Sequence, residues 1–282
     1  MTDSLLTRPL LMIGCGNMAG AMLEGWLAAG ADPRMITVVR PSGQAPAPGI
    51  RTLTSLPEDE APALVLLGVK PQKLANVAPG LAPVLAPETI LVSILAGVSL
   101  ASLRTAFPAP RTVVKAMPNL PVALRQGVVE LHTDASSDAA ATADVERLMS
   151  ALGKAEWFED ESLFAVAGAL TAAAPAFLYR FIDALAAAGE ELGLPADQAA
   201  RLATAMAEGA AALAAASPET PGQLARRVAS PGGTTEAGLG VLDEGSGLRP
   251  LVARALRASR RRGIEMAEAA AARSAKRPMN GA

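Results

Sequence analysis

Short apolar runs alternate with helical patterns over the first 160 residues of the chain. Runs that predict buried strands lie at residues 10–13, 35–39, 63–69, 89–95 and 112–116. Two further β segments are predicted at residues 127–132 and 155–158, with a helix at 139–152 between them. Continuous apolar strands separated by crossovers are typical of a parallel sheet between layers of helices. We therefore predict an α/β domain, with residues 44–60 as an irregular connection.

The pattern changes to alanine-rich helix near residue 162. Helices are predicted at residues 163–192, 196–217, 221–228, 235–244 and 248–272. They carry apolar and small residues on more than one face, as at residues 210–216, and such helices need burial on all sides. A partner subunit is one way to supply it. We predict two domains, residues 1–161 and 162–282, and a homodimer or higher homo-oligomer.

Residues 10–20 read Leu-Leu-Met-Ile-Gly-Cys-Gly-Asn-Met-Ala-Gly, which predicts a strand, a tight turn and a helix. This is the context of a Rossmann-type dinucleotide fingerprint, whose glycines permit the turn and let the backbone approach a pyrophosphate. The alternative is a tight turn without a ligand. The pyrophosphate would lie on the positive end of the helix dipole. The predicted cofactor contacts in this turn are Gly14, Gly16, Asn17, Met18 and Ala19.

Arg40 follows the second predicted strand, where dinucleotide folds often carry an acidic residue for the ribose hydroxyl. An arginine at this place suits a ribose 2′-phosphate, and Ser42 could assist it. The sequence thus favours NADPH, with NADH possible. The alternative is a solvent-exposed arginine at the end of a strand.

Three further loops follow predicted strands and are expected at the same edge of the sheet, where such folds bind ligands. A proline stiffens the loop after the third strand, and two prolines flank an asparagine after the fifth. The loop at residues 117–119 could present backbone groups to a nicotinamide. The further cofactor-binding residues that we predict in these loops are Val69, Lys70, Pro71, Gln72, Ala96, Met117 and Asn119.

Residues 230–236 read Ser-Pro-Gly-Gly-Thr-Thr-Glu at the start of a predicted helix. Two glycines followed by two hydroxyl residues can form a small anion nest, and the absence of lysine and arginine suits a carboxylate better than a phosphate. The alternative is a capped helix start with flexible glycines.

Composition excludes several classes of site. Cys15 and His132 are the single cysteine and histidine, so an internal disulfide is impossible, and a zinc site or a Cys–His pair is not expected; no metal is predicted. The net charge of −2 and the lone basic cluster at residues 254–262 give no nucleic-acid surface. No apolar stretch is judged long enough to span a membrane, so a cytoplasmic protein is expected.

Taken together, these motifs resemble those of the pyrroline-5-carboxylate reductase family. The segments that carry the resemblance are the Gly-x-Gly-Asn-Met-Ala fingerprint and residues 69–72, 93–99, 117–119, 230–235 and 237–239. The resemblance implies an NAD(P)H-binding domain, a helical dimerisation domain and an active site with parts of both subunits. It also assigns Gly233, Thr234 and Thr235 to the substrate carboxylate, with the Thr235 hydroxyl as the candidate catalytic group near the ring nitrogen.

The chain departs from the family pattern in two places. Thr-Ala-Ala-Ala-Pro-Ala-Phe at residues 171–177 replaces the usual Ser-Gly-Ser-Gly-Pro-Ala-Tyr, a stretch that lies near the site in the family, and Leu120 replaces a usual threonine.

The implied activity is hydride transfer to the C=N bond of 1-pyrroline-5-carboxylate, giving L-proline. Two alternatives stay open. One is a reductase of another cyclic imine or of a β-hydroxyacid, although no lysine acid stands between Lys154 and Lys276. The other is a non-catalytic NADP-binding protein.

Overall fold

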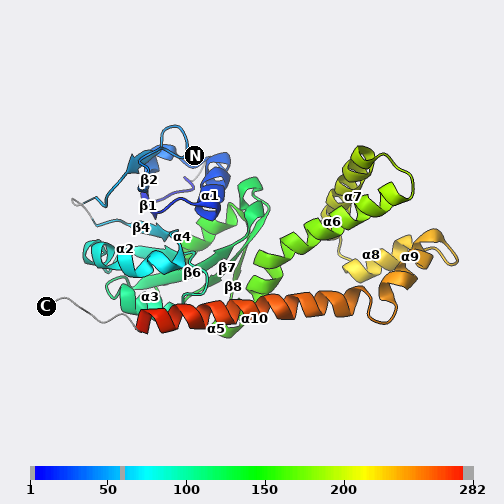
Figure 1. Ribbon diagram of the computed structural model, residues 1–282. Helices are drawn as coiled ribbons and strands as arrows, with labels where there is room; N and C mark the ends of the chain where they lie inside the picture. Colours follow the sequence, from blue (N-terminus) through cyan, green and yellow to red (C-terminus); the bar gives the residue numbers. More distant parts are fainter. Residues whose placement is uncertain (1–3, 58–60, 276–282) are drawn as a thin grey trace. The chain divides into compact units, whose positions relative to one another are not determined.

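The computed structural model describes residues 4–57 and 61–275 of the 282-residue chain (Figure 1). The chain divides into two compact units, Met1–Ala172 with Arg260–Ala282, and Ala173–Ser259. The predicted boundary is residue 161, whereas the units divide after Ala172, so the helix α5 (Glu161–Gly168) belongs to the first unit.

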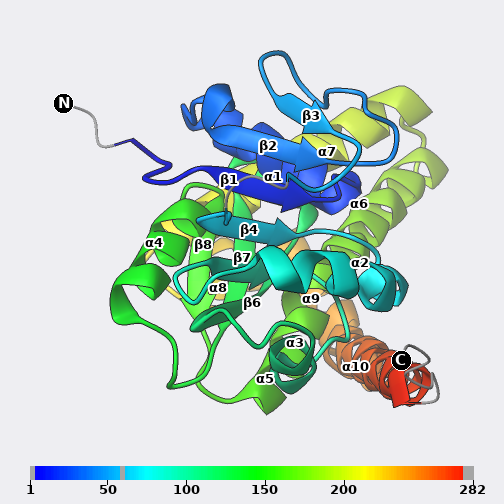
Figure 2. The ribbon, with the colours of Figure 1, turned by 90° about the vertical axis from the view of Figure 1, so that its left-hand side faces the viewer.

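The first unit is built on one eight-stranded sheet in the order β3-β2-β1-β4-β5-β6-β7-β8 (Figure 2). All neighbouring strands are parallel except β6 and β7. The order reverses between β1 and β4, which is the point where such sheets bind a dinucleotide. The strands are β1 (Leu10–Ile13), β2 (Ile36–Val39), β3 (Arg51–Leu53), β4 (Leu64–Leu67), β5 (Ile90–Ser93), β6 (Thr112–Pro118), β7 (Gly127–His132) and β8 (Gly153–Trp157).

Helices cover both faces of this sheet, because its apolar strands would otherwise expose both sides to water. α1 (Asn17–Ala28) and α4 (Ala139–Ser150) share one apolar core with one face. The indole N–H of the fully buried Trp26 joins them by donating to Leu148 O at 2.9 Å. α2 (Leu74–Leu81) and α3 (Leu100–Ala106) cover the other face, and α5 (Glu161–Gly168) packs on β7.

Three details differ from the sequence predictions. β3 lies inside residues 44–60, which we expected to be irregular; it is a three-residue edge strand without an apolar run. Met117 and Pro118 continue β6, although a loop was predicted there. The helix expected at residues 163–192 is interrupted by a π-helical turn at Ala169–Ala173, because Pro175 lacks the N–H that an α-helix needs there.

The second unit is all helical. Its helices are α6 (Ala174–Glu191), α7 (Ala196–Ala216), α8 (Pro221–Val228), α9 (Thr234–Asp243) and the first part of α10 (Leu248–Ala275). α6 and α7 pack against each other. Yet Ala199 and Ala203 are the only buried apolar residues within Ala173–Ser259, a range that the structure describes throughout.

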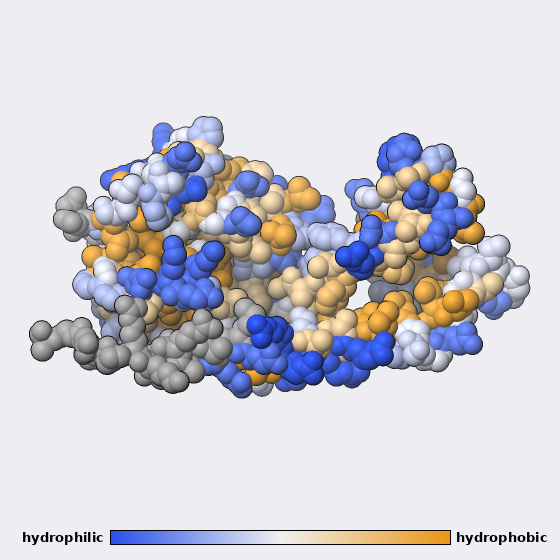
Figure 3. Space-filling model, viewed as in Figure 1, coloured by the Kyte–Doolittle hydropathy of each residue, from blue (hydrophilic) through white to orange (hydrophobic). Residues whose placement is uncertain are grey.

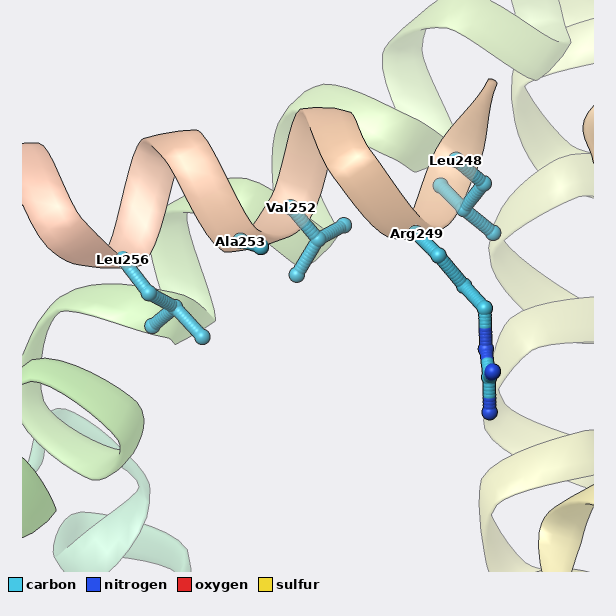
Figure 4. A pocket seen from close by; sticks show the side chains of 5 residues that line it. All are labelled: Leu248, Arg249, Val252, Ala253 and Leu256. Atoms are coloured by element: carbon cyan, nitrogen blue, oxygen red, sulfur yellow. The ribbon is translucent and has the colours of Figure 1, made fainter. Parts of the chain in front are cut away.

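Large apolar side chains therefore lie on the surface of the second unit, where Figure 3 shows them as orange and tan patches. Leu248, Val252 and Leu256 follow one another at four-residue spacing, and Figure 4 shows them beside Arg249 along α10. Leu178, Phe181 and Leu185 form a similar row on α6. Exposed apolar surface of this extent indicates a covering partner.

One helical run, Glu161–Glu191, is long and apolar enough by length and composition to cross a membrane, with a mean hydropathy of 1.6 in its best window. This corrects the prediction that no stretch reaches that length. The property by itself is weak evidence for a membrane span, since helices of soluble proteins can share it.

Candidate active site

The fingerprint turn between β1 and α1 needs glycine at Gly14. Its φ is +86°, and an added Cβ would lie 2.9 Å from Val69 Cγ1 and 3.1 Å from Gly68 O. The Gly14 N–H donates to Val39 O at 2.9 Å, which pins the turn between β1 and β2. The loops after β1 and β4 are thus in close contact, and no larger residue fits between them.

Gly16 is free of such constraints, since a Cβ there would meet nothing within 4 Å. It is the N-cap residue of α1, and no side chain caps this helix. The first N–H groups of α1 therefore have neither a capping side chain nor a partner within the helix. At the third fingerprint position, the Ala19 Cβ lies 3.0 Å from the place of a Gly68 Cβ, so a small residue is required. This cradle fits a pyrophosphate.

Arg40 lies next to this turn, directly after β2. Its N–H donates to Leu53 O at 2.9 Å, which fixes its backbone to β3, and its side chain is half-buried. Burial raises the pKa of the Cys15 thiol, and the Arg40 guanidinium acts in the opposite direction, so that cation lies close to the turn. Ser42 follows on the surface, and the structure gives its hydroxyl only a 3.4 Å contact with the Gln44 N–H.

The remaining predicted loops of the first unit lie at the same edge of the sheet. Ile13, Leu67 and Ser93 end their strands side by side in the register. Val69 is half-buried against Gly14, while Lys70 and Gln72 are exposed around a 3₁₀ turn that Pro71 begins. Ala96 is exposed in the turn after β5. Asn17 and Met18 open α1 beside them.

Asn119 differs from the other predicted residues because both ends of its amide are used inside the protein. Its Oδ1 accepts from the Val128 N–H at 2.9 Å, and its Nδ2 donates to Thr171 O at 3.0 Å. Met117 lies two residues before it, half-buried at the end of β6. The Asn119 amide thus holds the loop in place, and any contact with a cofactor would come from the loop itself.

A buried carboxyl group next to this loop was missed in the sequence. Glu130 on β7 stands opposite Met117 and is fully buried. Its Oε1 accepts a hydrogen bond from the Thr171 hydroxyl, and its Oε2 has no partner. Burial raises the pKa of Glu130 to about 7, and the Thr171 hydrogen bond opposes this rise. A single glutamate inside the apolar run Val-Val-Glu-Leu was the available signal.

His132 is held inside the fold by a hydrogen bond to the backbone. It is buried, and its Nδ1 is hydrogen-bonded to Phe158 O at 2.8 Å. The bond ties β7 to the residue that follows β8, which is a structural role.

The loop at residues 230–236 belongs to the second unit. Gly233 is the N-cap of α9, and its N–H donates to Ser230 O at 2.9 Å, while Thr234 and Thr235 begin the helix. No side chain caps α9, so Thr235 is not a helix cap. Its side chain is exposed.

A carboxylate already lies on this loop. Glu236 Oε2 accepts from the Gly232 N–H at 2.6 Å. The Thr234 and Thr235 N–H groups, at the first helical positions, have no partner within the helix. The Gly233 N–H is used internally, so of the three predicted carboxylate donors only the Thr234 and Thr235 N–H groups are left without a partner in the helix.

Comparison with known proteins identifies the family. The model described as pyrroline-5-carboxylate reductase dimerisation matches residues 161–266, and the model described as NADP oxidoreductase, coenzyme F420-dependent, matches residues 10–97. A pyrroline-5-carboxylate reductase of Pseudomonas aeruginosa is 39% identical over 268 residues, covering 93% of this chain and 98% of the relative. The chain belongs to the pyrroline-5-carboxylate reductase family. It is therefore an oxidoreductase.

Other relatives and solved structures agree with this assignment. The Escherichia coli protein of the same name is 33% identical over 258 residues, which are 89% of this chain and 95% of the Escherichia coli chain. The structure of a pyrroline-5-carboxylate reductase from Coxiella burnetii matches with a TM-score of 0.83 and 30% identity, over 92% of this chain and 98% of that one. The two-part architecture predicted from the sequence, an α/β Rossmann-type domain followed by a helical dimerisation domain, is confirmed.

Proposed function

We propose that this protein reduces 1-pyrroline-5-carboxylate to L-proline and uses NADPH as the reductant. The observation that carries the proposal is the match to pyrroline-5-carboxylate reductases over nearly the whole of both chains. The two matching family models include the fingerprint turn and the loop at residues 230–236. A likeness confined to the Rossmann-type unit would support only a nucleotide site.

The fingerprint turn would hold the cofactor pyrophosphate on the free N–H groups of α1. Arg40 would bind the 2′-phosphate, because it is a half-buried cation beside the turn where NADH-specific folds often have a carboxylate. When bound, the nicotinamide supplies the hydride. A solved relative from Plasmodium falciparum with NADP bound shares the fold, with a TM-score of 0.81 at 23% identity.

The residues that would bind the substrate carboxylate are Thr234 and Thr235, through their free N–H groups and the Thr235 hydroxyl. Their position at the start of α9 supports this assignment, since the first N–H groups of a helix without a capping side chain are available to an anion. Thr235 is free to bind substrate because it has no capping task. A protonated imine is already electrophilic, so the residues are required chiefly to position it.

The protein would act as a cytoplasmic homodimer or larger homo-oligomer. The dimerisation model over residues 161–266 and the exposed apolar rows of the second unit support this. A partner that covers these rows also accounts for the apolar run Glu161–Glu191 without a membrane. An assay of NADPH oxidation and proline formation with 1-pyrroline-5-carboxylate tests the proposal.

A further inference from the structure

Glu130 lies at the level of the ligand-binding edge of the sheet. The register aligns Ile13 with Leu67, Leu67 with Ser93, and Ser93 with Lys115. Met117, opposite Glu130, is two residues further along β6. The carboxyl group is therefore slightly beyond the ends of β1, β4 and β5. Since Val129 and Leu131 pack into the core with α1 and α4, Glu130 faces the side of the sheet that α5 covers.

No cation neutralises this carboxyl group: Glu130 forms no ion pair with any of the residues that the structure describes. The charged groups on this face have other partners. Lys115 on β6 pairs with Glu161 of α5, and Glu156 on β8 pairs with Lys154 at 3.0 Å. On β7 itself, His132 Nδ1 is bonded to Phe158 O. Burial without compensation favours the neutral acid.

The partner of Glu130 lies at an irregular turn. Thr171 is in the π-helical turn Ala169–Ala173, and in a regular α-helix its carbonyl would accept from residue 175. Because Pro175 has no N–H, the Asn119 amide supplies the missing donor at 3.0 Å. Thr171 thus connects two parts of the site: its carbonyl binds Asn119 in the loop after β6, and its hydroxyl binds Glu130.

We propose that Glu130 is a positioning residue of the reductase: in its neutral form it holds Thr171, and through Thr171 it holds Asn119 and the nicotinamide-pocket loop at residues 117–119. The inference rests on the proposed function for the role of that loop. Glu130 does not touch the substrate in this account. Its effect is on the geometry of a loop that the proposed cofactor must meet.

Two acceptors compete for the single proton of the Thr171 hydroxyl. Thr171 Oγ1 donates to Glu130 Oε1, and it also lies 3.2 Å from Ala167 O. When Glu130 carries a proton on Oε1, the first bond can reverse: Glu130 then donates to Thr171, and Thr171 is released to donate to Ala167. If Glu130 is ionised, Thr171 must donate to it, and the contact with Ala167 is lost. The raised pKa of about 7 places this change within the working pH range.

Ionisation would release the proton to solvent and leave a buried, uncompensated charge beside the loop. The chain would relieve it by moving the carboxylate or the π-helical turn toward water. We therefore expect cofactor affinity and turnover to fall as pH rises through about 7.

The Glu130→Gln variant tests this directly, because an amide can donate to Thr171 as the neutral acid does and cannot ionise. The measurement is kcat/KM and the NADPH dissociation constant, the latter from cofactor fluorescence, between about pH 5 and about pH 9, roughly two units on either side of the expected pKa. We expect the ratio of variant to native kcat/KM to stay within about twofold at low pH and to rise about tenfold by one unit above the pKa. Because both proteins are assayed with the same substrate at each pH, any ionisation of the substrate itself cancels in this ratio of kcat/KM values.

Matched controls separate positioning from general disruption. Glu156→Gln removes an exposed carboxylate from the adjacent strand and should leave both pH profiles unchanged. Thr171→Val should weaken NADPH binding at every pH, and Thr171→Ser should restore it, since serine keeps the hydroxyl.

Thermal unfolding measures the same ionisation through stability. Because the pKa of Glu130 is raised from 4.5 to about 7 by folding, the native protein should lose stability relative to Glu130→Gln as pH rises from about 4.5 to 7.

The infrared spectrum of the protein gives an independent reading without substrate or cofactor. A protonated-carboxyl C=O band should be present at low pH, disappear as pH rises through about 7, and be missing in Glu130→Gln. Two results would overturn the proposal: a ratio of variant to native kcat/KM that does not depend on pH, or the absence of the protonated-carboxyl band from the native protein at low pH. If 1-pyrroline-5-carboxylate is not turned over, the NADPH affinity and the infrared band still decide the role of Glu130, so the two failures are distinguishable.

Discussion

Thr235 is the residue on which the proposed substrate site depends most. Its hydroxyl is exposed at the start of α9 and does not cap that helix. We predict that Thr235→Val lowers kcat/KM about ten- to a hundredfold, because losing one hydrogen bond to a charged group costs about 1.5–3 kcal/mol. Steady-state kinetics with 1-pyrroline-5-carboxylate measures this.

The matched control is Thr235→Ser, which should recover most of the activity. NADPH affinity and the melting temperature of Thr235→Val should stay close to the native values, since no helix cap is lost. Unchanged kinetics with a lowered melting temperature would return Thr235 to a structural role.

Arg40 is the residue to which we assign the preference between the two nicotinamide cofactors. Its cation lies close enough to the fingerprint turn to act on the Cys15 thiol. We predict that the native protein prefers NADPH and that Arg40→Asp erases or reverses the preference by repelling the 2′-phosphate. Comparison of kcat/KM for NADPH and NADH tests this. A native preference for NADH, or an unchanged preference in the variant, contradicts the role of Arg40.

Among single residues, the sequence reveals those whose role is set by the conformation of the neighbouring backbone. Gly14 and Ala19 are recognisable because the tight turn and its close contact with the loop after β4 require small residues at both positions. The role of Glu130, and the hydrogen bonds that the Asn119 amide makes within the protein, are not recognisable in this way. They depend on a contact with Thr171, 41 residues from Glu130 along the chain, that only the folded molecule brings about.

The strands and helices show the same division: those set by their own sequence are predictable, and those set by tertiary contacts are not. Strands β1, β4 and β5 are predictable because parallel strands buried on both faces are apolar throughout. β3 escapes prediction because an edge strand needs no such run. The π-helical turn escapes because Pro175 alone permits several outcomes, from a kink to a helix end, and the Asn119 amide decides between them.

The helices of the second unit predict an assembly. Leu178, Phe181 and Leu185 form an exposed apolar row on α6, and a partner subunit would cover it. We predict at least a homodimer in sedimentation velocity, and a shift toward monomer with loss of activity in Leu185→Glu.

Ala187→Glu is the control for this substitution. It adds the same charge two residues later, roughly 200° around the helix and on its other side. This variant should stay assembled. A native protein that is a stable and active monomer would contradict the assembly.

At the scale of the whole molecule, sequence and structure agree on two parts with different tasks. The Rossmann-type unit has its own core on both faces of the sheet, so it is complete within one chain. Within Ala173–Ser259, all of which the structure describes, the helical unit buries only Ala199 and Ala203 among its apolar residues. Such a unit gains most of its buried surface from association, in agreement with the dimerisation model that matches it.

Turnover with defined substrates tests the central claim most directly. The native protein should oxidise NADPH in the presence of 1-pyrroline-5-carboxylate and release one L-proline for each NADPH consumed. Omission of substrate should stop the reaction, and Thr235→Val should slow it strongly. If folded, NADPH-binding protein gives no NADPH oxidation above the rate without enzyme, the proposed function is wrong.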